Sequence, residues 1–301
     1  MIKNNNMNKT IPLFAALAAL LIAVPLRIYQ YSKIINPETG FYDKIDASVF
    51  VLYIILGIAV VIGLVVPFLR HASVKPVPLS NKSVGFAVVS LLMAICLIID
   101  SASQLMDYFE LYSANQMLSN QAMKQLISVQ GGTLLLLQAA FGAFSAVYFF
   151  VTGITIGLGN SDSSKFRILA LVPTVWCIFR LLYRFKRTIS FVNVSDLLLE
   201  LFLIVFSMMF FFALAQVNSK IDSFSDGGST VQSVFWKIYG YGIPAALFAV
   251  VCFLPRFILR ATGKPALINP SYGVNFSDFS FAVFTLYTCL TAVRADKEAI
   301  E

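Results

Sequence analysis

Long apolar runs recur along the whole chain, and they restrict what it can fold into. A helix needs about 20 apolar residues to cross about 30 Å of hydrocarbon at 1.5 Å per residue, and the runs here repeatedly approach that length. Because 58% of the 301 residues are hydrophobic and 12% are charged, the chain also lacks the polar surface that a soluble domain of this size carries. The sequence therefore predicts an integral membrane protein.

The predicted spans are α-helices rather than strands of a barrel. Backbone N–H and C=O groups must be paired internally in lipid, and the apolar runs are continuous instead of alternating with a period of two. We predict an all-α, polytopic bundle of about eight transmembrane helices that forms one domain over residues 1–301. The fifth span is interrupted by Arg180, and the eighth opens with Asp278. An alternative has seven spans, with the fifth as a re-entrant segment, because eight spans leave the positive charges equally divided between the two sides. The eight spans are 11–31, 48–69, 83–101, 132–157, 168–185, 196–217, 236–256 and 274–293.

The connection between spans three and four, residues 100–130, is long and polar. Its apolar residues Leu105, Tyr108, Phe109 and Tyr112 recur at roughly helical spacing. This pattern predicts an extramembrane connection with one or two amphipathic segments that lie on the membrane surface or cap the bundle.

Spans five and six carry the most informative charges. A tight turn at 188–192 would bring residues whose numbers sum to about 380 to equal depth. Arg184 would then face Asp196, and Arg180 would face Glu200; each pair of like charges is also spaced i, i+4 on one helical face. Two ion pairs are therefore predicted. They are either a structural clamp or a ligand-binding or gating site where an anionic solute competes for the arginines, unless the charges only snorkel to the interface.

Six arginines fall at the same end of their predicted spans and would form a ring there. The ring would contact lipid phosphates, or it would attract anions into a cavity between the helices. These arginines are Arg27, Arg180, Arg184, Arg187, Arg256 and Arg260.

A weak internal repeat joins two of the loops. Ile35–Phe41 reads Ile-Asn-Pro-Glu-Thr-Gly-Phe, and Ile268–Val274 reads Ile-Asn-Pro-Ser-Tyr-Gly-Val. Each copy follows a span with a proline near its end, Pro25 or Pro255, and a nearby arginine. Duplication of a helical hairpin and chance similarity both account for this pattern.

The positive-inside rule gives no orientation when it is applied to the whole sequence. Eight spans place 11 of the 22 Lys and Arg residues on the side of the two termini and 11 on the other side. The residues on the side of the termini are Lys3, Lys9, Arg70, Lys75, Lys82, Lys165, Arg167, Lys220, Lys237, Arg294 and Lys297.

The residues needed for common catalytic or metal sites are missing. The one histidine, His71, lies in a basic loop, so neither zinc chemistry of the HExxH type nor Ser-His catalysis can be built. The four cysteines fall inside apolar runs without CxxC spacing. We expect that the protein is not an enzyme and that it has no catalytic residues, no cofactor and no metal site. The net charge of +7 predicts contact with membrane lipids and not with nucleic acid.

One combination of motifs resembles a known group of proteins. It consists of Arg27-Ile28-Tyr29-Gln30 before Asn36-Pro37-Glu38-Thr39-Gly40-Phe41, followed by Phe179-Arg180-Leu181-Leu182 and Val194-Ser195-Asp196. The chain resembles hypothetical multi-pass membrane proteins of clostridia and related Firmicutes. That family carries no assigned activity, so the resemblance implies a bacterial cytoplasmic membrane and no mechanism.

Two functions of different classes remain open. The first is a transporter or channel-like protein for a small solute, with an anion suited to the arginines. The second is a membrane sensor or assembly protein that transports nothing and contacts a protein partner through residues 100–130. A water-accessible cavity at Arg180 and Glu200 favours transport, whereas a dry core with an exposed apolar patch on residues 100–130 favours the partner.

Overall fold

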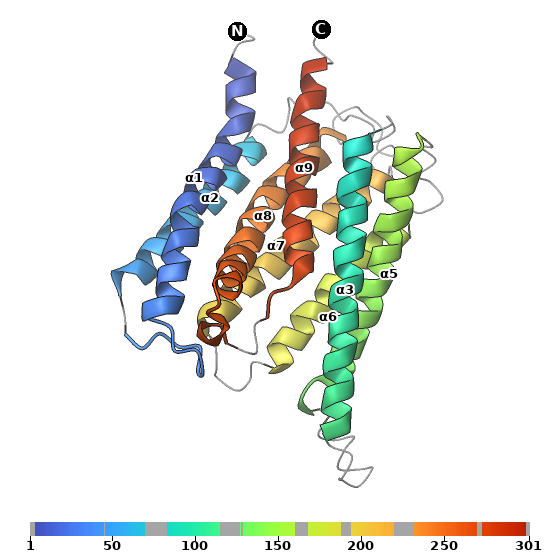
Figure 1. The fold of residues 1–301 in the computed structure, drawn as a ribbon. Coiled ribbons are helices and arrows are strands. Elements are labelled where there is room, and N and C mark those ends of the chain that lie inside the picture. The colour runs from blue at the N-terminus through green and yellow to red at the C-terminus, as the bar shows by residue number, and fades with distance from the viewer. Residues whose placement is uncertain are drawn as a thin grey trace.

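The chain folds into a bundle of long helices, as the computed structural model in Figure 1 shows. The structure describes residues 4–44, 46–69, 83–114, 127, 129–159, 168–187, 194–219, 231–269 and 273–298. Within these ranges the regular elements are helices, and Ile35 and Tyr42 form an isolated β-bridge. The long helices are α1 (Asn4–Lys33), α2 (Ala47–Leu69), α3 (Val84–Ala114), α5 (Gly132–Gly157), α6 (Val172–Arg187), α7 (Val194–Ser219), α8 (Val231–Ala261) and α9 (Phe276–Glu298). Two short 3-10 turns are η3 (Leu169–Leu171) and η5 (Pro265–Leu267).

The predicted all-α membrane bundle is confirmed. Among the described residues, 6 helices are long and apolar enough to cross a membrane, namely α1, α2, α3, α5, α7 and α8. The predicted spans 168–185 and 274–293 fall on α6 and α9, which are not among these 6. The start of α1 and the end of α9 lie at the same end of the bundle (Figure 1), as an even number of antiparallel passes requires. We call this end the terminal end.

Helix α8 lies at the centre of the packing. It contacts α1, α2, α7 and α9, while α3 packs against α5 and α9, and α6 packs against α5 and α7. The outer faces of α1 and α2 expose large apolar side chains such as Leu21 and Ile54. Such a face suits lipid, because burying it against hydrocarbon needs no polar partner.

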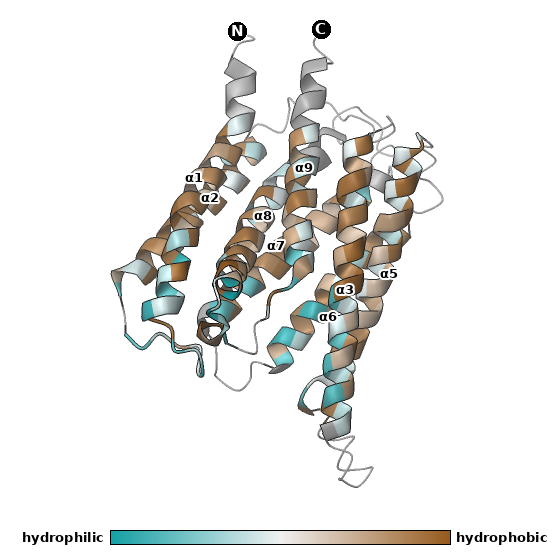
Figure 2. Ribbon diagram, viewed as in Figure 1, coloured by the Kyte–Doolittle hydropathy of each residue, from teal (hydrophilic) through white to brown (hydrophobic). Residues whose placement is uncertain are grey.

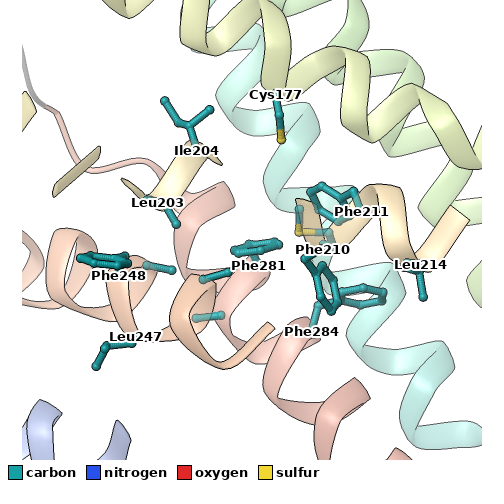
Figure 3. Close-up of a cluster of buried hydrophobic side chains, with 14 of the residues drawn as sticks. Cys177, Leu203, Ile204, Phe210, Phe211, Leu214, Leu247, Phe248, Phe281 and Phe284 are labelled. Carbon is teal, nitrogen blue, oxygen red and sulfur yellow. The ribbon is translucent and has the colours of Figure 1, made fainter. Parts of the chain in front are cut away.

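Aromatic side chains fill the core between α7 and α9. Phe210 and Phe211 on α7 interlock with Phe281 and Phe284 on α9 (Figure 3). The rings of Phe211 and Phe281 meet edge to face with centroids 5.2 Å apart, a geometry that aromatic quadrupoles favour. The core at this level is therefore closely packed and apolar.

Helix α3 does not end where the predicted third span ends. It continues without a break from Val84 to Ala114, 31 residues, or about 46 Å at 1.5 Å per residue. This exceeds about 30 Å of hydrocarbon, and Figure 1 shows the end of α3 projecting beyond its neighbours. The predicted third span, 83–101, therefore ends too early, because residues 101–114, which we call the α3 extension, belong to the same helix. Their location outside the membrane stays a prediction. Residues 115–126 and 128 lie outside the described residues.

Candidate functional site

Charged and polar residues gather at the end of the bundle opposite the termini, which we call the charged end (Figure 2). The last turns of α1, α6 and α8 meet the first turns of α7 and α9 there. Asp196 lies in the first turn of α7, and Glu200 follows one turn later on the same face. This spacing presents two carboxylates, one above the other, to the neighbouring helices.

Asp196 joins α7 to α1 and α8. Its Oδ1 accepts hydrogen bonds from Arg27 Nη2 at 2.7 Å, from Arg256 Nη2 at 3.1 Å and from the Tyr31 hydroxyl. The side chains of Asp196 and Arg256 are 2% exposed and that of Arg27 is 1% exposed. One carboxylate therefore holds two arginines from two helices in a dry environment.

Glu200 extends this cluster to α6. Its Oε1 accepts a hydrogen bond from Arg256 Nη1 at 2.6 Å, and its Oε2 lies 2.8 Å from Arg184 Nε in an ion pair. Arg256 is thus shared between both carboxylates, and its Nε donates to the Tyr31 hydroxyl at 3.1 Å. The result is one chain of ion pairs, Arg27–Asp196–Arg256–Glu200–Arg184, which we call the ion-pair network.

A second ion pair connects α6 to α9. Arg180 binds Asp278 through two parallel hydrogen bonds of 2.6 and 2.9 Å, the strongest geometry for these groups. The Arg180 guanidinium also lies 5.6 Å from the Trp176 ring centroid. Arg180 is therefore fixed on both sides by its own helix and by α9.

The pairing predicted from the sequence is wrong in register. Arg184 pairs with Glu200 rather than with Asp196, and Arg180 pairs with Asp278 rather than with Glu200. The register of α6 against α7 differs from the prediction by about one helical turn. Besides their contact with each other, α6 packs against α5 and α7 packs against α8, and this packing lies outside the reach of a spacing argument. The four predicted site residues do lie together at the charged end. Their role as a ligand-binding or gating site stays a prediction.

The pairs predicted from the sequence left out Arg27, Tyr31 and Arg256. Arg27 and Tyr31 lie on α1, and Arg256 lies towards the end of α8, 60 positions from Asp196, so the spacing around the turn between α6 and α7 could not bring them to Asp196. For the two arginines, the signal was their place near the prolines of the internal repeat. Arg27 and Arg256 are also not part of a lipid-facing ring, because both are buried, whereas Arg260 is exposed.

The two copies of the internal repeat meet in space. Asn269 Nδ2 in the second copy donates hydrogen bonds to the carbonyl oxygens of Pro37 at 2.9 Å and Glu38 at 3.3 Å in the first. Arg27 and Arg256, which precede the two copies, both bind Asp196. The α1–α2 and α8–α9 hairpins are therefore linked twice, by their loops and through one carboxylate. Whether the copies arose by duplication stays a prediction.

Asp100 on α3 caps the start of α9. Its Oδ1 accepts the backbone N–H of Phe276 at 3.1 Å, and its Oδ2 accepts that of Ser277 at 2.7 Å. The first N–H groups of a helix have no partner within the helix and favour negative charge. A cap supplied by another helix fixes the depth of α9, and with it the position of Asp278.

Burying the charges of this network costs free energy, and removing one partner from it would cost free energy as well. Removing charges from water costs several kcal/mol per ion, which their mutual attraction offsets only when the geometry is good. Three arginines face two carboxylates here, so the network carries one excess positive charge. Its central residues Arg27, Asp196, Glu200 and Arg256 are 0 to 2% exposed. In this arrangement the guanidinium groups of Arg27 and Arg256 already bind carboxylates.

The described residues contain no group of three His, Cys, Asp or Glu side chains that could hold a metal ion. The four cysteines are buried free thiols: Cys96, Cys177, Cys252 and Cys289. His71 lies outside the described residues.

Comparison with known proteins adds no family. No protein-family model, curated protein or solved structure matches this chain. The function must therefore be argued from the charged end and the surface.

Proposed function

We propose that this protein is a membrane sensor or assembly protein that acts through a protein partner. The observation that supports this proposal is that the arginines which an anionic solute would need are already occupied. Arg27, Arg184 and Arg256 are held by Asp196 and Glu200, and Arg180 is held by Asp278.

An incoming anion would have to displace one of these carboxylates. The displaced carboxylate would then be buried without its partner, and breaking a buried ion pair in this way costs about 3–5 kcal/mol. The bound anion would have to offset that cost before it gained any affinity. The network is better suited to holding helices together than to exchanging ligands.

The α3 extension supplies a surface for the partner. Met106 is 67% exposed and Phe109 is 63% exposed, beyond the length of helix that the hydrocarbon accounts for. Met and aromatic side chains are enriched at protein interfaces. Glu110 is exposed beside them, and residues 100–123 contain no Lys or Arg. The complementary partner is a protein segment with apolar side chains flanked by basic ones.

Photo-crosslinking from α3 tests this proposal. We expect a photoreactive amino acid in place of Phe109 to form an adduct with another protein. The matched control is the same amino acid in place of Ile98, which is 55% exposed and lies three turns earlier on the same helical face, at membrane depth. Adducts of that variant should contain lipid only.

Charge reversal identifies the chemistry of the adduct. Glu110→Lys should lower its yield about tenfold, the effect of about 1.4 kcal/mol of binding free energy. Glu38→Lys, which reverses an exposed charge in the α1–α2 loop, should leave the yield unchanged. Equal protein adducts from both positions, or an adduct that survives Glu110→Lys, would contradict the proposal.

Transport of a small anion is the second candidate. It is favoured by the sharing of Arg256 between two carboxylates, because such a bridge can break on one side while it persists on the other. The structure would then represent a state that is closed at the charged end.

Thiol labelling separates the two functions. Single cysteines placed along 178–183 and 197–202, in a chain without its four native cysteines, are treated with a membrane-impermeant reagent. The partner proposal expects complete protection on the face of Arg180 and Glu200. Labelling there that an added anion blocks would establish a water-filled solute pathway and overturn it.

A further inference from the structure

The ion-pair network changes how the positive charges of this chain should be counted. The positive-inside rule concerns Lys and Arg in the loops and at the helix ends, where they interact with anionic headgroups and resist transfer across the membrane. Four arginines assigned to the charged end are not free to interact with headgroups. Arg27, Arg180, Arg184 and Arg256 are buried, and each is paired with a carboxylate.

When these four arginines are left out, the two sides of the membrane no longer carry equal numbers of Lys and Arg. The terminal end keeps its 11 basic residues. The charged end keeps seven, namely Lys33, Lys44, Lys124, Lys186, Arg187, Arg260 and Lys264. The second and third loops differ in the same direction, because 70–82 contains Arg70, Lys75 and Lys82, whereas 115–131 contains only Lys124.

We infer that the terminal end faces the cytoplasm and that the charged end, with the α3 extension, faces the opposite side of the membrane. This orientation follows from the loop charges, because Asp and Glu contribute little to the rule. It deepens the proposed function, on which its second part rests: the partner is a protein segment outside the cytoplasm that binds Met106 and Phe109.

Labelling of intact cells with an impermeant maleimide tests the orientation. Cys96, Cys177, Cys252 and Cys289 are first replaced by alanine, and one cysteine is then introduced at a time. Glu38→Cys and Ser113→Cys mark the charged end, since both positions are exposed. Leu158→Cys marks the terminal end, since Leu158 at the end of α5 is 75% exposed.

We expect E38C and S113C to react in intact cells and L158C to react only after the membrane is permeabilised. The reverse pattern would overturn the orientation. Protection of S113C both before and after permeabilisation would overturn the exposed α3 extension. If removing the native cysteines prevents folding, a fluorescent protein fused after Glu301 of the unaltered chain gives the same answer, because it should fluoresce only in the cytoplasm.

The outcomes for orientation and for partner binding are independent. Labelling of S113C from outside without any adduct from Phe109 leaves the orientation standing and removes the proposed partner. An adduct from Phe109 with a cytoplasmic protein, together with labelling of L158C in intact cells, leaves the partner and overturns the orientation.

Discussion

Asp196→Asn lowers the stability of the solubilised protein by about 3–5 kcal/mol, whereas Arg27→Gln lowers it by about 1.5–3 kcal/mol. Asp196 is the acceptor for Arg27, Arg256 and Tyr31, and its side chain is buried at the charged end. Without its charge, three buried arginines would face Glu200 alone. Loss of Arg27 is milder, because Asp196 would keep Arg256 and the remaining two arginines would match the two carboxylates.

The comparison is made by heating each variant in detergent and measuring the fraction that stays monodisperse by size-exclusion chromatography. Glu38→Gln removes an exposed carboxylate and serves as the control, with a melting temperature expected at the wild-type value. Equal losses for Asp196→Asn and Arg27→Gln would show that the charge balance of the network does not govern its stability.

The second large effect concerns the pair of Arg180 and Asp278. Arg180→Met leaves a buried carboxylate unpaired, and Asp278→Ala leaves a buried guanidinium unpaired, so each change alone costs about 3–5 kcal/mol. The double variant leaves neither charge behind. We expect it to be more stable than the sum of the single changes predicts, with a coupling energy of about 0.5–3 kcal/mol from a double-mutant cycle.

The matched cycle replaces Arg180 and Glu200, which the sequence spacing had paired. Arg180→Met with Glu200→Gln should show a smaller coupling, because Glu200 forms ion pairs with Arg184 and Arg256. If this second cycle gave the larger coupling, the register of α6 against α7 and α9 would be wrong.

Sequence reasoning succeeded where a property depends on neighbouring residues. The apolar runs predicted the membrane bundle, because the number of residues needed to cross hydrocarbon can be counted along the chain. It placed the end of α3 too early. The third span was predicted to end at 101, yet polar side chains do not end a helix that meets neither Gly nor Pro, and the helix continues to Ala114.

The sequence by itself predicted that charges at one end of the bundle are paired. Isolated arginines and carboxylates at membrane depth are costly, so Arg180, Arg184, Asp196 and Glu200 were expected either to find partners or to reach the interface. Tertiary structure alone decided which partners they have. Contacts such as Arg27 with Asp196 join residues 169 positions apart, and they depend on the depth and rotation of whole helices. Those are set by the packing of the apolar faces around α8, which no local spacing encodes.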